Sequence, residues 1–182
     1  MSCMRKGKLL LVLGYRDYEE IRAKKDLIHG GGMLLKHMLD RWSIPRSSWD
    51  HTYVFSHHKN AIPTQKMERW QFLKDSIEDL KHYIQNYDPT EIIAMGALPC
   101  EVFTGFSRVT RKQGTCRRFR KEWQDLEVKR VWISLSTDAC LFDPNDMVKI
   151  SRVIRTAAKV AGIPIKPKPL NEAISFDWEP YL

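Results

Sequence analysis

The chain is poor in cysteine and lacks the spacings on which cysteine-based sites depend. Its four cysteines, Cys3, Cys100, Cys116 and Cys140, are widely scattered and form no CxxC pair. We therefore predict free thiols, as in a cytosolic protein, with a four-cysteine cluster as the alternative. His, Cys and acidic residues do not assemble into a recognisable zinc-ligand pattern either, so we expect no metal and no cofactor.

Long hydrophobic runs are also absent. No stretch approaches the roughly 20 apolar residues that a membrane helix needs. The N-terminal sequence MSCMRKGKLLLVLGY turns from basic to apolar as a signal peptide does, but the run Leu9–Leu13 is short and leads directly into Gly14. We interpret this run as a buried strand and expect a cytoplasmic protein with no membrane partner.

The common phosphate-binding and nucleophile motifs are missing too. GxxxxGK[ST], GxSxG and HExxH do not occur, so a P-loop in particular is not expected. The run Gly30–Gly32 precedes a predicted helix but does not directly follow a strand, which rules out the dinucleotide-binding fingerprint. These glycines either bring backbone amides close to a phosphate or form a turn that permits close packing.

What the chain has in excess is positive charge. It carries 30 Lys and Arg against 22 Asp and Glu, with a formal net charge of +8. The segment Arg108–Lys121 holds seven of these cations and no acid, with Gly114 near its middle. A helix would stack these like charges three and four residues apart, so we predict a loop or hairpin. The cluster favours a phosphate-bearing partner, and a solvated basic loop is the alternative.

Apolar patterning predicts four strands that alternate with helices. The strands are expected at residues 8–13, 52–55, 91–95 and 128–135, and the helices at 33–42, 65–87, 99–103 and 145–161, with Asn145 as the last N-cap. This order predicts a three-layer α/β/α sandwich around a central four-stranded parallel sheet. We expect one domain over residues 1–164 and an extended tail over 165–182.

The tail differs in composition from the rest of the chain. Its sequence, IKPKPLNEAISFDWEPYL, is rich in proline at first and then acidic and aromatic. The tail either wraps the body of its own chain, with Phe176, Trp178 and Tyr181 as anchors, or docks on a partner protein. We expect the wrap, because large aromatic side chains are usually buried.

Candidate chemistry lies just beyond the strands, because ligand crevices of parallel sheets form at the carboxyl ends of the strands. After the first strand, Asp17 offers a carboxylate that can position water or stabilise a cation, with Glu19 and Glu20 as rivals. Tyr15 and Tyr18 beside it can stack on a base.

The other three strands end in polar or glycine-containing segments. Ser56 and His57 follow the second strand and can face a base. The amides of Gly96 and Ala97, after the third strand, can hold a phosphate. Beyond the fourth strand lie further polar candidates, Thr137 and Asp138.

These motifs together resemble the uracil-DNA glycosylase superfamily, especially its shorter bacterial and phage-type members. The resemblance covers about residues 8–162 and rests on LLLVLG, GGGMLLKHML, TYVFSHHK, EIIAMGALPCEVFTG, VTRKQGTCRRF and WISLSTDACLFDPN. It implies a DNA partner and hydrolysis of the N-glycosidic bond of a flipped uracil or modified pyrimidine. The alternative is a catalytically inactive DNA-binding accessory protein on the same fold, with a role in phage replication or defence.

The resemblance also assigns roles to the candidate residues. Catalytic roles fall on Asp17, Asp138 and Thr137; base contacts on Gly14, Tyr15, Tyr18, Ser56 and His57; and DNA contacts on Gly96, Ala97, Arg111, Lys112, Arg117 and Arg118. The chain has Ser56 where the family has its base-reading Asn, and Thr137 or Asp138 where the family has its second-motif His. Its first motif reads Gly-Tyr-Arg-Asp, where the family usually has Gly-Glu or Gly-Gln followed by Pro. The shorter Ser56 predicts a wider and less exacting base pocket.

Overall fold

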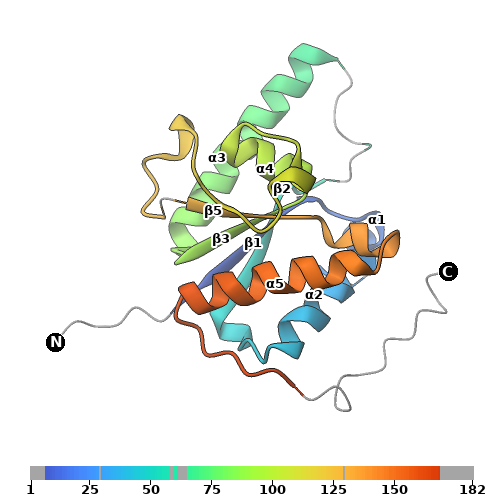
Figure 1. The fold of residues 1–182 in the computed structure, drawn as a ribbon. Helices are drawn as coiled ribbons and strands as arrows, with labels where there is room; N and C mark the ends of the chain where they lie inside the picture. The colour runs from blue at the N-terminus through green and yellow to red at the C-terminus, as the bar shows by residue number, and fades with distance from the viewer. Residues whose placement is uncertain (1–6, 29, 58–59, 61–64, 129, 169–182) are drawn as a thin grey trace.

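A mixed five-stranded sheet forms the centre of the fold, with strand order β2-β1-β3-β5-β4 (Figure 1). The computed structural model describes residues 7–28, 30–57, 60, 65–128 and 130–168. The strands are β1 (Leu9–Tyr15), β2 (Trp49–Phe55), β3 (Glu91–Met95), β4 (Cys116–Arg118) and β5 (Arg130–Ser134). The first three and β5 are parallel, which confirms the predicted α/β class, whereas β4 runs antiparallel to β5. The prediction of a four-stranded, wholly parallel sheet is therefore wrong, because β4 adds a fifth, antiparallel strand at the edge.

Helices cover both faces of this sheet (Figure 1). The helices are α1 (Tyr18–Ala23), α2 (Gly30–Arg41), α3 (Lys66–Tyr87), α4 (Ala97–Thr104) and α5 (Asn145–Val160). Short 3-10 helices are η1 (Arg46–Ser48), η3 (Val109–Arg111), η4 (Lys121–Trp123) and η5 (Thr137–Leu141). The core against α2 and α5 occupies one face, and the core against α3 and α4 occupies the other. Among the described residues, no helix is both long and apolar enough to cross a membrane.

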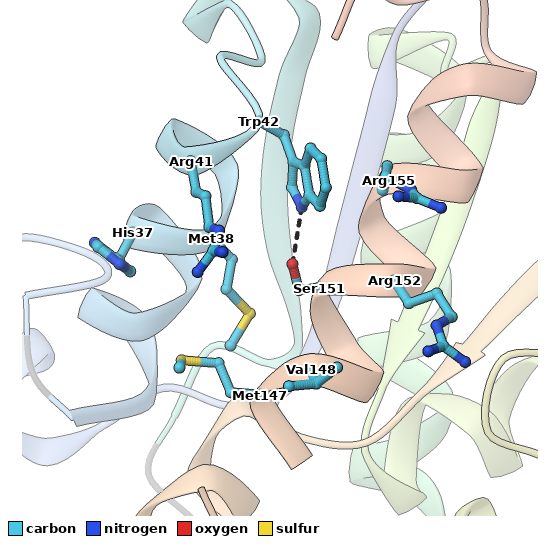
Figure 2. Close-up of a pocket in the computed structure, with 9 residues that line it drawn as sticks. All are labelled: His37, Met38, Arg41, Trp42, Met147, Val148, Ser151, Arg152 and Arg155. Carbon is cyan, nitrogen blue, oxygen red and sulfur yellow. Dashed lines mark hydrogen bonds between the residues drawn. The ribbon is translucent and has the colours of Figure 1, made fainter. Parts of the chain in front are cut away.

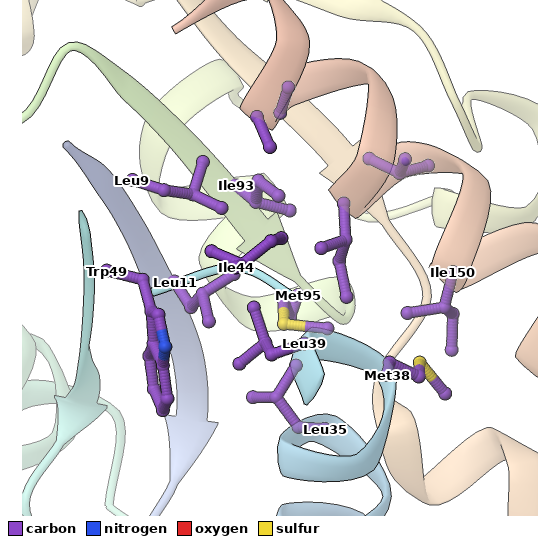
Figure 3. Close-up of a cluster of buried hydrophobic side chains, with 14 of the residues drawn as sticks. Leu9, Leu11, Leu35, Met38, Leu39, Ile44, Trp49, Ile93, Met95 and Ile150 are labelled. Atoms are coloured by element: carbon purple, nitrogen blue, oxygen red, sulfur yellow. The ribbon is translucent and has the colours of Figure 1, made fainter. Parts of the chain in front are cut away.

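Strand β1 shows why the sheet is buried on both sides. Successive side chains of a strand point to opposite faces. Leu9 and Leu11 pack into the α2/α5 core (Figure 3), and Leu10 and Val12 pack into the α3/α4 core. All four are fully buried, as the continuous apolar run predicts.

Helix α2 begins earlier than the sequence suggests. The three residues Gly30–Gly32 form its first turn rather than a loop before it. A Cβ atom on Gly31 would lie 2.7 Å from Thr137 Oγ1, and one on Gly32 would lie 2.6 Å from Leu27 Cα. The glycines therefore permit close packing of this helix against η5 and against the loop after α1.

Helix α5 begins at Asn145, but Asn145 is not its N-cap. Pro144 precedes the helix and makes no side-chain capping bond. The carboxylate of Asp143 instead accepts the Asn145 backbone N–H at 3.0 Å. The predicted capping role of Asn145 is therefore wrong, because Asp143 already satisfies the first amide.

The described start of the tail lies along the carboxyl end of α2. The backbone N–H of Lys166 donates to Trp42 O at 3.0 Å, and that of Lys168 donates to Arg41 O at 2.9 Å. The predicted anchors Phe176, Trp178 and Tyr181 lie outside the described residues.

Candidate functional site

The carboxyl ends of the parallel strands meet at one edge of the sheet. A Cβ atom on Gly14, at the end of β1, would lie 3.9 Å from Leu98 Cβ at the start of α4. Gly96, which ends β3 with φ +98°, is so close to Ser136 that a Cβ would lie 3.3 Å from the serine Cβ. The positive φ and this contact both require glycine. The loops after β1, β3 and β5 are therefore direct neighbours.

An aromatic series joins the ends of β1 and β2. Tyr15, which is 37 % exposed, stacks on Phe55 with ring centroids 5.8 Å apart. Phe72 of α3 contacts Phe55 at 5.2 Å and His57 at 5.6 Å. The hydroxyl of Ser56 lies 3.2 Å from His57 Nδ1. Of the expected base-contacting residues, Tyr15, Ser56 and His57 are thus brought together through two phenylalanines.

Asp17 caps α1. Its Oδ1 accepts the Glu19 backbone N–H at 2.9 Å, and Glu20 Oε2 accepts the Asp17 backbone N–H at 3.3 Å. This reciprocal arrangement is a capping box. Asp17 remains exposed, and the neighbouring Tyr18 is 61 % exposed. The carboxylate is therefore held at the sheet edge while it stays accessible to solvent.

Glu20 supports this loop from inside. Its side chain is buried, and its Oε2 accepts the Tyr53 hydroxyl proton at 2.9 Å. Burial, and then the charge and hydrogen bond of Glu20, raise the pKa of Tyr53. A Cβ atom on Gly32 would lie 3.0 Å from Glu20 Oε1, so this carboxylate also contacts the first turn of α2. Of the rival carboxylates predicted beside Asp17, Glu20 is therefore a positioning residue.

A chain of charged groups, which sequence reasoning missed, lies behind the β1 loop. Arg16 pairs with Asp26 at 2.5 Å, and His51 lies 3.6 Å from Asp26 and 3.7 Å from Asp50. Burial lowers the pKa of His51, against the opposing pull of Asp26 and Asp50. The sequence carried one signal for this cluster. His51 lies on the same face of β2 as Trp49 and Tyr53, which pack against the core, so a polar side chain at this position needs polar partners.

The loop after β5 presents Asp138. The Ser136 hydroxyl oxygen accepts a hydrogen bond from the Asp138 backbone N–H at 3.3 Å, and the hydroxyl donates to Asp138 Oδ2 at 3.2 Å. Thr137 is only 2 % exposed, so of the two predicted residues only Asp138 faces solvent. Since a Cβ on Gly31 would collide with Asp138 Oδ1, the Asp138 carboxylate touches the same helix turn as Glu20.

Two apolar side chains are exposed next to Asp138. Leu141, the last residue of η5, is 43 % exposed, and Phe142, which follows it, is 90 % exposed. Sequence reasoning did not single out either residue.

The cations of the basic segment lie near opposite ends of strand β5. Arg111 and Lys112 precede Gln113, whose Oε1 accepts the Leu135 N–H at 2.5 Å, beyond the end of β5. The chain then runs antiparallel to β5, so that Arg117 pairs with Val131 and Arg118 with Arg130, at the opposite end of that strand. The four expected DNA-contacting cations share the β5 edge, but only the first two lie beside the sheet edge that carries Asp138.

Three cysteines lie in the described part of the chain, Cys100, Cys116 and Cys140, and all three are free thiols, as predicted. Burial raises the pKa of Cys140 to about 11 and raises the pKa of Cys100 and Cys116 as well. Thiols with raised pKa are poor nucleophiles at neutral pH. Over the described residues, no cluster of three His, Cys, Asp or Glu side chains is arranged to hold a metal ion.

A scan against models of known protein families finds no match, and a search of curated proteins finds none.

Proposed function

We propose that the protein binds DNA and hydrolyses the N-glycosidic bond of a flipped uracil or modified pyrimidine. The observation that supports this most directly is the grouping at one sheet edge of exposed carboxylates, stacking aromatics and an adjacent basic loop. The carboxylates are Asp17 and Asp138, and the aromatics are Tyr15 and Tyr18. The resemblance of the sequence motifs to the uracil-DNA glycosylase superfamily points to the same chemistry.

Base flipping requires a group that replaces the extruded base and a surface that receives it. Exposed Phe142 is suited to entering the base stack, since apolar side chains that insert between base steps unstack DNA. The flipped pyrimidine then stacks on Tyr15 or Tyr18, with Ser56 and His57 at its edge. Unstacking costs a few kcal/mol, which phosphate contacts from the basic loop offset.

The chemical step needs a carboxylate near the sugar. The bond between C1′ and the base nitrogen breaks with oxocarbenium character, and the base leaves with the bonding electrons. Water then bonds to C1′ and its proton passes to the departing base. Asp17, held by the capping box, stabilises the cationic sugar or positions the water. Asp138 is the second carboxylate at the same edge.

Base release from defined duplexes tests the proposal. Purified protein is incubated with single- and double-stranded oligonucleotides that carry uracil, thymine or pyrimidines enlarged at the 5-position, and abasic sites are cleaved with alkali. We expect strand cleavage at one or more of the modified pyrimidines. If no base in the panel is released while DNA still binds, the catalytic part of the proposal is wrong.

DNA affinity as a function of salt tests the binding surface separately. Each phosphate contact contributes about 0.9 to the slope of log K against log salt. Arg111→Ala/Lys112→Ala should make the salt dependence weaker, with the magnitude of the slope smaller by about 2. Arg117→Ala/Arg118→Ala should lower it by about 1, because neighbouring strand residues face opposite sides.

The control for that measurement removes two exposed cations outside the basic segment, Lys159 and Lys166. Lys159→Ala/Lys166→Ala should leave the slope at the wild-type value. Equal slopes for all three double variants would show that general positive charge, rather than the basic segment, binds the DNA.

The second candidate function is DNA binding without catalysis. It is favoured by the capping role of Asp17, because a carboxylate that accepts a helix amide has a structural purpose without any reaction. The two candidates differ only in the base-release assay, since both predict the same salt dependence of DNA binding.

A further inference from the structure

A groove lies between α2 and α5 (Figure 2). It encloses about 270 Å³. Its apolar wall consists of Met38 from α2, Trp42 directly after α2, and Met147 and Val148 from α5. Val148 is 61 % exposed, so this wall is open to solvent in the described structure.

The Trp42 ring is held in a defined orientation. Its Nε1–H donates to Ser151 Oγ at 2.8 Å, which links the residue directly after α2 to α5 (Figure 2). The Arg155 guanidinium lies 5.2 Å from the ring centroid. A large apolar ring fixed by a hydrogen bond and a cation contact forms a preorganised wall, so a ligand that packs on it does not have to order it.

The groove also carries unpaired positive charge. Arg41, Arg152 and Arg155 line it, and none of the three forms an ion pair with an acid in the described part of the chain. The Arg155 Nε atom is buried and has no hydrogen-bond acceptor there. Buried donors normally have partners, so the groove fits a ligand that is both apolar and acidic.

The chain itself leads to this groove. After α5 it turns back, and the backbone of Lys166 and Lys168 bonds to the carbonyls of Trp42 and Arg41. The Lys168 ammonium group also pairs with Asp40 at 2.6 Å. The last described residue is therefore attached to α2, the helix that forms one wall of the groove.

The residues that follow have the matching composition. PLNEAISFDWEPYL, residues 169–182, contains Glu172, Asp177 and Glu179 and no Lys or Arg. Its large aromatics are Phe176, Trp178 and Tyr181. Acidic and aromatic residues thus alternate in the same short stretch.

The distances permit docking within one molecule. Phe176 lies eight residues beyond Lys168, which corresponds to a reach of about 26 Å in extended chain. Along α5 the groove extends from Met147 to Arg155, which is about 12 Å of helix. A short tether also gives a high effective concentration, about millimolar, so weak contacts suffice.

We propose that residues 176–182, FDWEPYL, dock in the α2/α5 groove of their own chain. Their aromatic side chains pack against Trp42, Met147 and Val148, and Asp177 and Glu179 pair with the three groove arginines. None of the groove residues is among the proposed DNA contacts, so the docking does not depend on the proposed function.

Hydrogen exchange of the full chain, followed by mass spectrometry, tests the docking. Val148→Glu places an acid in the groove and removes apolar surface, at an exposed position that tolerates substitution. Val160→Glu is the matched control, since Val160 is also exposed on α5 but does not line the groove. We expect the amides of residues 177–182 to exchange at least about tenfold more slowly than in an unstructured peptide, in the wild type and in Val160→Glu. Val148→Glu should return them to the unstructured rate.

A charge exchange tests the ion pairs. Arg152→Glu/Arg155→Glu should abolish the protection, and adding Asp177→Lys/Glu179→Lys to the same chain should restore it. Unprotected tail amides in the wild type would overturn the proposal, and so would protection that survives Val148→Glu. Protection that disappears on dilution would also overturn it, because it would indicate docking on a second copy of the chain.

Discussion

The contact between α2 and η5 makes Gly31→Ala a sharp test of the site architecture. The added Cβ would lie 2.7 Å from Thr137 Oγ1 and 2.9 Å from the Asp138 backbone nitrogen, and it would collide with Asp138 Oδ1. Thr137 is buried and a backbone nitrogen cannot swing aside, so α2 and η5 must separate. Overpacking of this kind costs about 1–3 kcal/mol, whereas Ala in place of Gly returns at most about 1 kcal/mol of helix propensity.

The net destabilisation expected for Gly31→Ala is therefore about 1–2 kcal/mol. For a chain of this size that corresponds to a fall in Tm of about 2–8 °C. Thermal and urea unfolding followed by circular dichroism measure it. Gly14→Ala is the control, because its Cβ would meet nothing closer than 3.9 Å, and it should be neutral or slightly stabilising. A Gly31→Ala protein as stable as the wild type would refute the reasoning that glycine is needed for this contact.

Three further predictions concern the residues behind and beside the site. Burial lowers the pKa of His51 below its usual 6.5, so the unfolded chain binds the proton more tightly and stability should fall as the pH drops below about 6.5. His51→Gln should flatten the dependence of the urea midpoint on pH in that range, and an unchanged pH dependence would contradict the assignment. Glu20→Ala should cost about 1–3 kcal/mol in urea unfolding because it leaves the Tyr53 hydroxyl unpaired, whereas exposed Glu19→Ala should change stability by less than about 0.5 kcal/mol. Ser56→Asn should shift base release toward uracil and away from pyrimidines enlarged at the 5-position, as measured by relative cleavage rates, and efficient wild-type release of uracil alone would contradict the wide-pocket prediction.

The parallel strands and their covering helices could be predicted because the spacing of their apolar residues indicates which side chains are buried. Residues Leu9–Leu13 of β1 are continuously apolar and are buried on both faces. The 3.6-residue periodicity of α3 predicted that helix to within one residue. Strand β4 could not be predicted in the same way. Its three residues, CRR, have no apolar alternation, and their extended conformation depends on pairing with β5.

The glycine run shows how packing outweighs local preference. Gly30–Gly32 was expected to lie before the helix, either as a phosphate-binding loop or as a turn that permits close packing, and glycine is a poor helix former. In the structure, Gly31 and Gly32 allow η5 and Leu27 to approach the first helical turn, a contact between segments far apart in the sequence. Only knowledge of those partners would have placed the run inside α2.

The candidate site was partly accessible from the sequence. The rule that ligands bind beyond parallel strands selected the loops that carry Asp17, Ser56, Gly96 and Asp138, and the structure places those loops at one sheet edge. The capping box was also readable, because an Asp is followed three residues later by Glu20. The burial of Thr137 was not readable, since it depends on the long-range approach of α2.

Single-turnover base release by wild type and Asp17→Asn, with DNA affinity measured in the same samples, tests the central claim most directly. The matched control is Asp125→Asn, an exposed carboxylate that lies after η4, outside the strand-end loops. We predict release of a modified pyrimidine by the wild type and by Asp125→Asn, and a rate at least about 100-fold lower for Asp17→Asn at unchanged DNA affinity. Equal rates for Asp17→Asn and wild type, or release by neither protein, would contradict the account.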